Sequence, residues 1–216
     1  MTTFVSPIVK GLVPVVLAVG ALLALSSWAT APLPQKSLHF ARTARFIVQA
    51  PFADAILIGD SRLQLAEPTD RAMVAGYNGA TFEQLERVAW VLCKLSNAPV
   101  VVALGVNDAR IPVRDVEATL ASAGRMVETC KADGLSLSAI WPTESEIEPF
   151  GSYYDTGAVA EIDQGLQQIA QEKGVTIVPP PDLSDHTSDG VHFKPEVSRL
   201  YVNTLADQAE LLRETS

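Results

Sequence analysis

Hydrophobic positions along this chain fall into two alternating patterns. Short uninterrupted apolar runs, such as residues 55–59 and 99–104, are typical of strands that are buried on both faces of a parallel sheet. Longer stretches repeat their apolar positions every three or four residues, as Phe82, Leu85 and Val88 do, which is the spacing of an amphipathic helix. The patterns predict strands at residues 55–59, 72–76, 99–104, 135–140 and 175–178, and helices at residues 37–50, 81–96, 113–132, 157–173 and 195–213.

Residues that begin and end helices support these boundaries. Thr81 is a suitable N-cap for the helix that follows it, while Gly134 and Gly174 are suited to left-handed C-caps. Strands that alternate with helices in this way predict an α/β fold, with a parallel sheet covered by helices. In such folds, ligands bind at the carboxyl ends of the strands.

The N-terminal part of the chain carries a long uncharged segment. Residues 11–31 are rich in Leu, Val and Ala, and as a helix they would extend about 30 Å, enough to cross a bilayer core. The segment is therefore predicted to be a transmembrane anchor or a signal peptide. Ala29-Thr30-Ala31 resembles a cleavage site, but the rigid Pro32 that follows favours an uncleaved anchor. We expect residues 1–36 to form this membrane segment and a linker, and residues 37–216 to form one globular domain.

Flanking charges leave two orientations open. Lys10 precedes the apolar segment, whereas Lys36, Arg42 and Arg45 follow it, and this distribution would hold the domain in the cytoplasm. A short tail before a first apolar segment is instead typical of an export signal. We favour export, which places the domain outside the cytoplasm at the membrane.

Charge and cysteine content narrow the classes of partner. The chain has 25 acidic and 16 basic residues and a net charge of −9, without a Lys/Arg run, so nucleic acid is not expected as a partner. Cys93 and Cys130 lie outside any CxxC motif, which gives no support to redox or zinc chemistry. They are either buried apolar residues or, outside the cytoplasm, a disulfide pair.

Four short segments carry groups suited to acyl transfer, and each follows a predicted strand. They contain Ser61, Gly79, Asn107 and the pair Asp189 and His192. Because the carboxyl ends of parallel strands share one edge of a sheet, we expect these groups to lie together. Serine needs a base to become a nucleophile, and a histidine base needs a carboxylate that fixes its tautomer.

Roles follow from this chemistry. Ser61 is the expected nucleophile, His192 the base, and Asp189 its partner. The oxyanion that develops in acyl transfer would be bound by the amides of Ser61 and Gly79 and by the Asn107 side chain. No metal or cofactor is required.

Together these blocks resemble the SGNH (GDSL-type) hydrolases, named for Ser, Gly, Asn and His in four sequence blocks, and the match covers residue 55 to the C-terminus. The resemblance implies a flavodoxin-like three-layer α/β/α fold and carboxylester or acyl-transfer activity without a metal. Arg62 departs from the pattern, since many members have leucine there. Gly76 competes with Gly79 for the glycine position.

Several functions remain open at this stage. If water resolves the acyl-enzyme, the protein is an esterase acting on an acylated small molecule, lipid or glycan, which is the reading that we favour. If a sugar hydroxyl does so, it is an O-acyltransferase that modifies an envelope or secreted polysaccharide. A non-catalytic, membrane-tethered binding module is the alternative outside enzymes. A nucleotide-binding protein is disfavoured, because no GxGxxG or GxxxxGK motif occurs at a strand-helix junction.

Other candidate residues have less specific interpretations. His39 is expected at the surface or the membrane interface. His186 lies near Asp182 and Asp185, so the loop offers possible metal ligands, although Asp189 and His192 are already assigned. Three aromatic residues either line a substrate pocket or pack in the core, namely Trp141, Tyr153 and Tyr154.

Overall fold

A five-stranded parallel sheet forms the centre of the protein. The computed structural model describes residues 7–130 and 134–215, with side chains from residue 14 on. The strands are β1 (Ile56–Gly59), β2 (Met73–Gly76), β3 (Val100–Ala103), β4 (Leu135–Ser138) and β5 (Thr176–Val178). Their order across the sheet is β2-β1-β3-β4-β5, and all neighbours run parallel. The predicted parallel sheet is confirmed.

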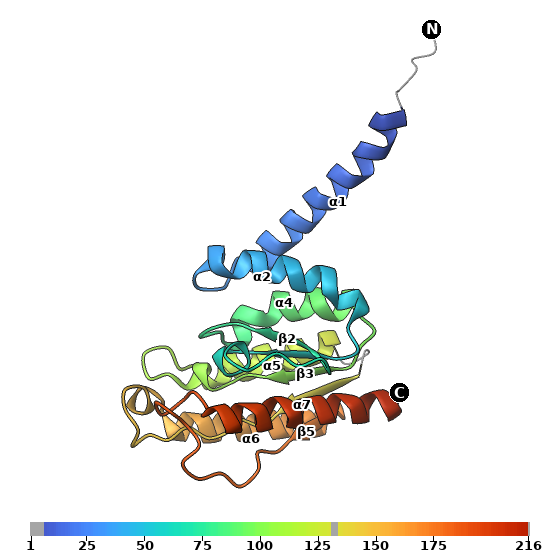
Figure 1. Cartoon of the computed structure of the whole chain (residues 1–216). Coiled ribbons are helices and arrows are strands. Elements are labelled where there is room, and N and C mark those ends of the chain that lie inside the picture. The colour runs from blue at the N-terminus through green and yellow to red at the C-terminus, as the bar shows by residue number, and fades with distance from the viewer. Residues whose placement is uncertain (1–6, 131–133, 216) are drawn as a thin grey trace.

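Helices cover both faces of this sheet (Figure 1). The α-helices are α1 (Pro7–Ala29), α2 (Lys36–Gln49), α3 (Ser61–Gln64), α4 (Phe82–Leu95), α5 (Val116–Cys130), α6 (Thr156–Lys173) and α7 (Pro195–Thr215). The described residues also include the 3-10 turns η1 (Ala50–Phe52), η2 (Asn107–Ala109) and η4 (Gly151–Tyr153). Helices α4, α5 and α6 pack on one face, α3 and α7 pack on the other, and α2 lies over the β2 edge. The predicted three-layer α/β/α arrangement is therefore present.

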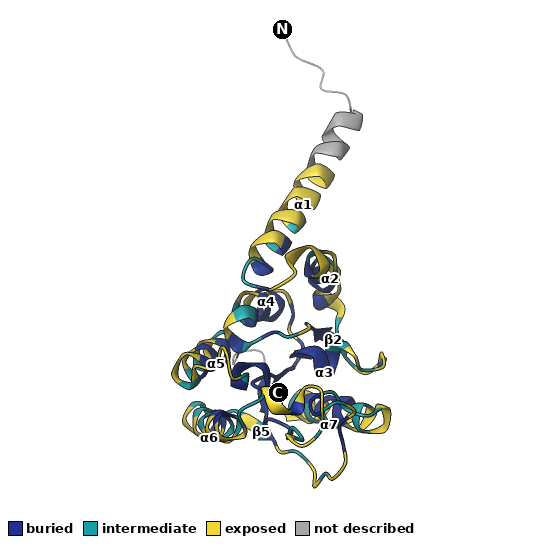
Figure 2. Cartoon of the chain, turned by 90° about the vertical axis from the view of Figure 1, so that its left-hand side faces the viewer, coloured by how far each residue is buried: buried dark blue, intermediate teal, exposed yellow. Residues whose placement is uncertain are grey.

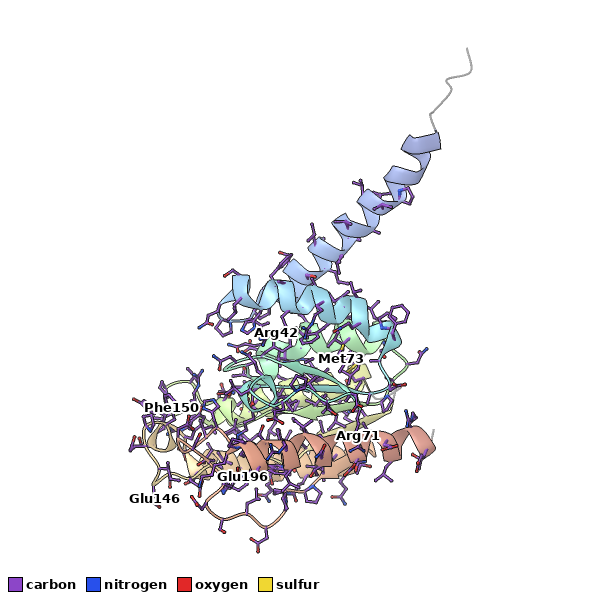
Figure 3. The ribbon with its side chains drawn as sticks, in the orientation of Figure 1. Arg42, Arg71, Met73, Glu146, Phe150 and Glu196 are labelled. Atoms are coloured by element: carbon purple, nitrogen blue, oxygen red, sulfur yellow. A yellow bond between two sulfur atoms is a disulfide. The ribbon has the colours of Figure 1, made fainter. Side chains whose placement is uncertain are left out.

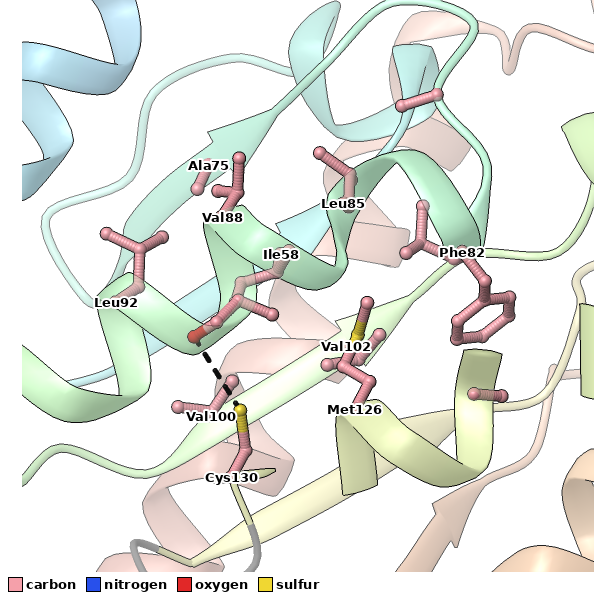
Figure 4. Close-up of a cluster of buried hydrophobic side chains, with 14 of the residues drawn as sticks. Ile58, Ala75, Phe82, Leu85, Val88, Leu92, Val100, Val102, Met126 and Cys130 are labelled. Atoms are coloured by element: carbon pink, nitrogen blue, oxygen red, sulfur yellow. Dashed lines mark hydrogen bonds between the residues drawn. The ribbon is translucent and has the colours of Figure 1, made fainter. Parts of the chain in front are cut away.

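Alternation of side chains along the buried strands builds two cores. Ile56 and Ile58 point into the larger core, which contains α4 and α5, whereas Leu57 points toward α7. Every residue of β1 and β3 is buried, as their uninterrupted apolar runs predict, and so is every residue of β4, where leucine alternates with serine. In Figure 4, Ile58, Val100 and Val102 lie against α4, and Met126 of α5 packs beside them.

Local signals in the sequence fix several element ends. Thr81 caps α4 in a capping box with Gln84, and Gly174 ends α6 in the left-handed conformation, as predicted. The helix expected from residue 113 instead begins at Val116, because the Asp115 side chain accepts the Ala118 amide and so acts as its N-cap. The far end of that predicted helix, residues 131–132, lies outside the described residues.

The strand predicted at residues 135–140 is shorter than expected. Its pairing with β5 ends at Ser138. The amide of Ile140 is then donated to Asp163 Oδ1 of α6 at 2.7 Å. A side-chain acceptor therefore replaces the sheet as partner and turns the chain out of the strand.

Helix α1 projects from the domain but is packed against it at one end (Figures 1 and 2). Ala29 and Leu33 are buried in the larger core, so residues before 37 contribute to the folded unit. The Trp28 ring lies 5.6 Å from the Trp90 ring of α4 in an edge-on contact. Farther from the domain, apolar side chains of α1 are exposed, namely Val15, Val16, Leu17, Val19 and Leu23.

Within residues 7–130 and 134–215, no helix combines the length and hydrophobicity needed to span a bilayer. The side chains of residues 11–13, where the expected membrane segment begins, lie outside the described ones. The anchor or signal segment stays a prediction.

Helices α4 and α5 are joined covalently. Cys93 and Cys130 form a disulfide with a Cα separation of 5.3 Å. The sequence left open whether these cysteines are free and buried or form a disulfide. The structure has the disulfide, and both half-cystines are buried.

Candidate active site

Ser61 stands where the central strand β1 gives way to the short helix α3. Asp60 caps this helix by accepting the Arg62 amide at 2.8 Å, which leaves Ser61 as the first helical residue. The Ser61 Oγ lies 3.1 Å from Nε2 of His192, a residue 131 positions later in the chain. The fold therefore brings the serine and the histidine of two distant sequence blocks into hydrogen-bonding contact.

Asp189 holds His192 in two ways. Its Oδ2 lies 2.7 Å from Nδ1 of the His192 ring, while its Oδ1 accepts the backbone amides of His192 at 2.8 Å and Val191 at 3.1 Å. One carboxylate thus orients both the ring and the backbone that carries it. With Nδ1 donating to Asp189, Nε2 faces the serine hydroxyl as an acceptor, which is the tautomer needed to take its proton.

Electrostatics keep Asp189 ionised. Burial alone would raise the pKa of its carboxyl group, but the bonds from the His192 ring and from the amides of His192 and Val191 outweigh burial. The pKa of Asp189 is therefore lowered from its ordinary value. A charged carboxylate at this position stabilises the imidazolium that forms when the histidine takes a proton.

A second loop supports the histidine from outside. Gly190 adopts a φ of 95°, and a Cβ there would lie 2.4 Å from both the Gly151 amide nitrogen and the Ile147 oxygen. The Asp189 carbonyl accepts the Phe150 amide at 3.0 Å. The Phe150 ring stands edge-on to His192 with centroids 6.0 Å apart. Figure 3 shows Phe150 and Glu146 together on the loops at this end of the molecule.

The expected oxyanion donors occupy loops after the neighbouring strands. Asn107 opens η2, and its Nδ2 donates to the Ala80 carbonyl at 3.2 Å while its Oδ1 accepts from the Tyr154 hydroxyl at 3.4 Å. Gly79 has a φ of 66° in the turn before Ala80. Within the described residues, the amides of Ser61 and Gly79 donate to no protein acceptor. These donors are placed in neighbouring loops, and their role in binding an oxyanion stays a prediction.

Gly76 has a structural reason to be glycine. It ends β2, and a Cβ there would approach the backbone nitrogen of Gln64 to 2.2 Å. The residue permits α3 to pack directly on the strand. This accounts for Gly76 and leaves Gly79 as the glycine candidate for the oxyanion site.

Asp108 joins the β3 loop to the first turn of α4. Its carboxyl group accepts the Phe82 amide at 3.1 Å and the Thr119 hydroxyl at 3.3 Å. Burial raises the pKa of Asp108 to about 7, against the opposing effect of these hydrogen bonds. Because Asn107 and the Gly79 turn flank this contact, Asp108 fixes the backbone on which the predicted oxyanion donors stand.

Aromatic residues near the site divide into core and surface. Trp141 is buried against Tyr201 and Phe193, so it packs in the core and does not line a pocket. Tyr154 contacts Asn107, whereas Tyr153 is exposed.

Of the other histidines, His186 lies in the loop before Asp189. Its Nε2 is 3.0 Å from the Pro142 carbonyl and its Nδ1 is 3.6 Å from Glu144 Oε1. The prediction that His39 lies at the surface or the membrane interface is wrong. The residue is 1% exposed and lies against Tyr77, because α2 turns this side chain toward the domain.

Glu144 was not identified from the sequence, although it organises the same loop. Its carboxylate accepts the amides of His186 at 3.1 Å and Thr187 at 2.7 Å, and the Thr187 hydroxyl as well. Nothing local in the sequence marks this residue, because its partners lie more than forty positions away.

Comparison with known proteins supports the assignment of the fold. No protein-family model matches the sequence, and no curated protein sequence matches it. Among solved structures, it is similar to a GDSL-like lipase from Bacteroides thetaiotaomicron, with 18% identity and a TM-score of 0.65 over 83% of this chain and 98% of that one. A lipase/acylhydrolase from Enterococcus faecalis matches with 19% identity and a TM-score of 0.55, covering 71% of this chain and 93% of that one.

A carbohydrate acetylesterase from Sinorhizobium meliloti is also similar, with 15% identity and a TM-score of 0.60 over 73% of this chain and 98% of the other. At these identities the likeness defines the fold. The chain has the fold of the SGNH hydrolases, in agreement with the resemblance carried by its four sequence blocks.

Gly190→Ala tests the geometry of the His192 backbone. The added methyl group meets backbone atoms and forces alanine into a conformation that costs about 1–3 kcal/mol, so we expect a lower unfolding temperature. Displacement of His192 should lower kcat by about 100-fold. Calorimetry and ester-hydrolysis kinetics measure the two effects.

Gly124→Ala is the matched control, because that glycine lies in α5 with no atom near the added methyl group. It should be stabilised by about 0.5–1 kcal/mol and keep its kcat. A Gly190→Ala protein with unchanged kcat would show that the conformation of this loop is not needed for activity.

Asp108→Asn tests the buried carboxyl group. The folded-state pKa of Asp108, about 7, lies above the unfolded one, so its contribution to stability is complete at low pH and is lost as the pH rises toward 7. Asparagine can still accept the Phe82 amide but does not titrate. From pH 4 to pH 8, the variant should therefore gain at least about 1.4 kcal/mol in unfolding free energy relative to wild type.

Urea unfolding at a series of pH values measures this difference directly. Burial also raises the pKa of Asp60, and because Asp60 raises the pKa of Asp108, the difference between the two proteins includes that coupling. A constant difference between the two proteins across the range would mean that Asp108 is not held in its protonated form.

Proposed function

We propose that the protein is a serine-dependent carboxylester hydrolase that acts through an acyl-enzyme intermediate. The observation that carries this proposal is the unbroken hydrogen-bonded chain from Asp189 through His192 to Ser61 at the carboxyl edge of the sheet. A carboxylate, an oriented imidazole and a serine hydroxyl in this order form the arrangement that activates serine in acyl transfer.

In the proposed reaction, Ser61 Oγ attacks the ester carbonyl carbon while His192 Nε2 takes the hydroxyl proton. The resulting oxyanion is bound by the amides of Ser61 and Gly79 and by Asn107 Nδ2. Collapse of this intermediate breaks the bond to the alcohol oxygen, which receives the proton from His192. Water then attacks the acyl-enzyme while His192 takes its proton. Collapse of this second intermediate breaks the bond to Ser61 Oγ, which receives that proton, and the acid is released. Asp189 stays ionised throughout.

The substrate is proposed to be an acylated small molecule, lipid or glycan. The similar structures include proteins described as a lipase and as a carbohydrate acetylesterase, which supports both lipid and sugar esters. If a sugar hydroxyl replaces water in the second step, the same residues perform O-acyl transfer. The two reactions share every step up to the acyl-enzyme and differ only in the acceptor.

We further propose that the domain is held at a membrane outside the cytoplasm by its N-terminal segment. Two features support this location. The apolar side chains of α1 that point away from the domain include Val15, Val16 and Leu17. The Cys93–Cys130 disulfide is of a kind that persists mainly in oxidising compartments.

Covalent labelling tests the proposed nucleophile. A fluorophosphonate probe should label wild-type protein at Ser61, since only an activated serine attacks such phosphorus centres readily. Ser61→Ala should remove the label and hydrolysis of p-nitrophenyl acetate, while Ser198→Ala, a helical serine outside the site, should keep both. Mass spectrometry of the labelled peptide identifies the residue.

A wild-type protein that is neither labelled nor active on short and long acyl esters would favour the non-catalytic binding module. Adding glycan acceptors to the same assay distinguishes the two enzymatic readings, because transfer yields an acylated sugar in place of free acid.

The location is tested in cells. A reporter that is active only after export, fused behind Ser216, should be active, and Cys93 and Cys130 should resist alkylation until a reductant is added. The same fusion without residues 1–25 keeps Ala29 and Leu33 in the core, and should lose reporter activity and membrane association. The export proposal would be overturned if this reporter were inactive, a second reporter that works only in the cytoplasm were active at the same position, and both thiols were free.

A further inference from the structure

Arg62, the residue after the nucleophile, is buried beneath the site. It is 3% exposed, although arginine is among the residues that are almost never fully buried without partners. Burial lowers the pKa of Arg62, against the attraction of Asp60 two residues earlier. A guanidinium nonetheless stays charged in proteins, so a cation is held inside the domain directly below Ser61.

The guanidinium group binds carbonyl oxygens from two separate loops. Nε donates to Val191 at 2.9 Å, Nη1 to Trp141 at 2.5 Å, and Nη2 to Pro142 at 3.1 Å. Its plane also lies over the Phe193 ring, with Cζ 4.4 Å from the ring centroid. Each of its three nitrogens is thus used, and the contacts on the His192 side come from the residues immediately before and after that histidine.

These contacts connect the two halves of the proposed reactive pair. The backbone of Arg62 is fixed to the nucleophile turn, because its amide binds the Asp60 cap. Its side chain is fixed to the loop that carries His192. The rigid fork of a guanidinium sets both ends of this connection at once.

We propose that Arg62 is a positioning residue that sets the distance between Ser61 and His192 by binding the Val191 carbonyl and the Trp141-Pro142 loop together. The proposal rests on the proposed function, in that it takes Ser61 and His192 as the reacting pair. Arg62 touches neither the expected substrate nor the reacting atoms, and acts through the backbone next to the base.

Leucine, which many SGNH hydrolases have at this position, cannot replace Arg62 in this protein. It would fill part of the space but leave the carbonyls of Trp141, Pro142 and Val191 without their donor. Lysine keeps the charge and part of the stem, but its ammonium group cannot match the planar fork. The leucine substitution therefore tests the loss of all hydrogen-bond donors, and the lysine substitution tests the loss of the planar guanidinium geometry alone.

The experiment compares Arg62→Leu and Arg62→Lys with wild type in kcat, KM, rate of fluorophosphonate labelling and unfolding temperature. Arg199→Leu, an exposed arginine paired with Glu67, controls for loss of an arginine. Met126→Ala, in the core between α4 and α5, controls for loss of stability far from the site. Both controls should keep the wild-type kcat.

Arg62→Leu should lower kcat and the labelling rate by about 100-fold with KM within a few-fold of wild type, because the base is displaced while the substrate surface stays in place. Arg62→Lys should fold even if Arg62→Leu does not, and should lose about tenfold or more in kcat. In a His192→Ala background, either Arg62 substitution should cause little further loss. A wild-type kcat in Arg62→Lys, or full additivity with His192→Ala, would overturn the proposal.

A spectroscopic readout separates this inference from the proposed activity. The proton between His192 Nδ1 and Asp189 gives a downfield NMR resonance whose shift and exchange rate depend on the position of the histidine. We expect Arg62→Lys to move or broaden this resonance, whereas Arg199→Leu leaves it unchanged. If wild type is inert toward esters and probe but the resonance responds in this way, the esterase proposal fails and the positioning role stands. An unchanged resonance in Arg62→Lys overturns the positioning role.

Discussion

The rest of this structure depends on one constraint, which is that the parallel strands β1, β2 and β3 are paired in a register that makes them end at the same level. Gly59, the last residue of β1, is paired with Gly76 of β2 on one side and with Ala103 of β3 on the other. Three adjacent strands therefore stop at the same height. The three loops that follow them start side by side, which brings the nucleophile turn, the Gly79 turn and Asn107 to one edge.

Buried polar side chains beneath this edge hold the loops that follow the strands in place. Asp60, Arg62 and Asp108 are all nearly inaccessible to solvent, and each binds backbone amides or carbonyls, with Asp108 also accepting the Thr119 hydroxyl. Loops cannot satisfy their own amides and carbonyls as helices and sheets do, so buried polar side chains supply the missing donors and acceptors. The arrangement is demanding, because a buried charge that loses its partners is strongly destabilising.

The sequence predicted the elements, and the proximity of Ser61, His192 and Asp189, for identifiable reasons. Strand runs and helical spacing are local patterns, and the predicted capping role of Thr81 needs only residues three positions apart. The pairing of Asp189 with His192 is likewise local, within one turn. The features that the sequence did not predict depend on contacts between residues that are distant in the chain. Arg62 meets carbonyl groups 79, 80 and 129 positions away, so its sequence shows only a departure from leucine.

The same argument explains the misplacement of His39, which is turned inward by the packing of α2 on the domain. Short elements were also beyond reach, since α3 has only four residues and no periodicity to detect. Pairing of Cys93 with Cys130 depended on the approach of two helices, which neither segment encodes alone.

The packing of α1 has a mechanical consequence. Only residues 30–35 separate α1 from α2, and Ala29, Leu33 and the Trp28–Trp90 contact hold the helix against the domain. A domain on a flexible stalk would sweep a hemisphere above its attachment point. This one would instead tilt and rotate together with its helix, so that under the proposed anchoring the tilt of α1 would set the height of the nucleophile over the lipid surface. Encounter with substrate would then be a two-dimensional search, restricted to esters presented at that height.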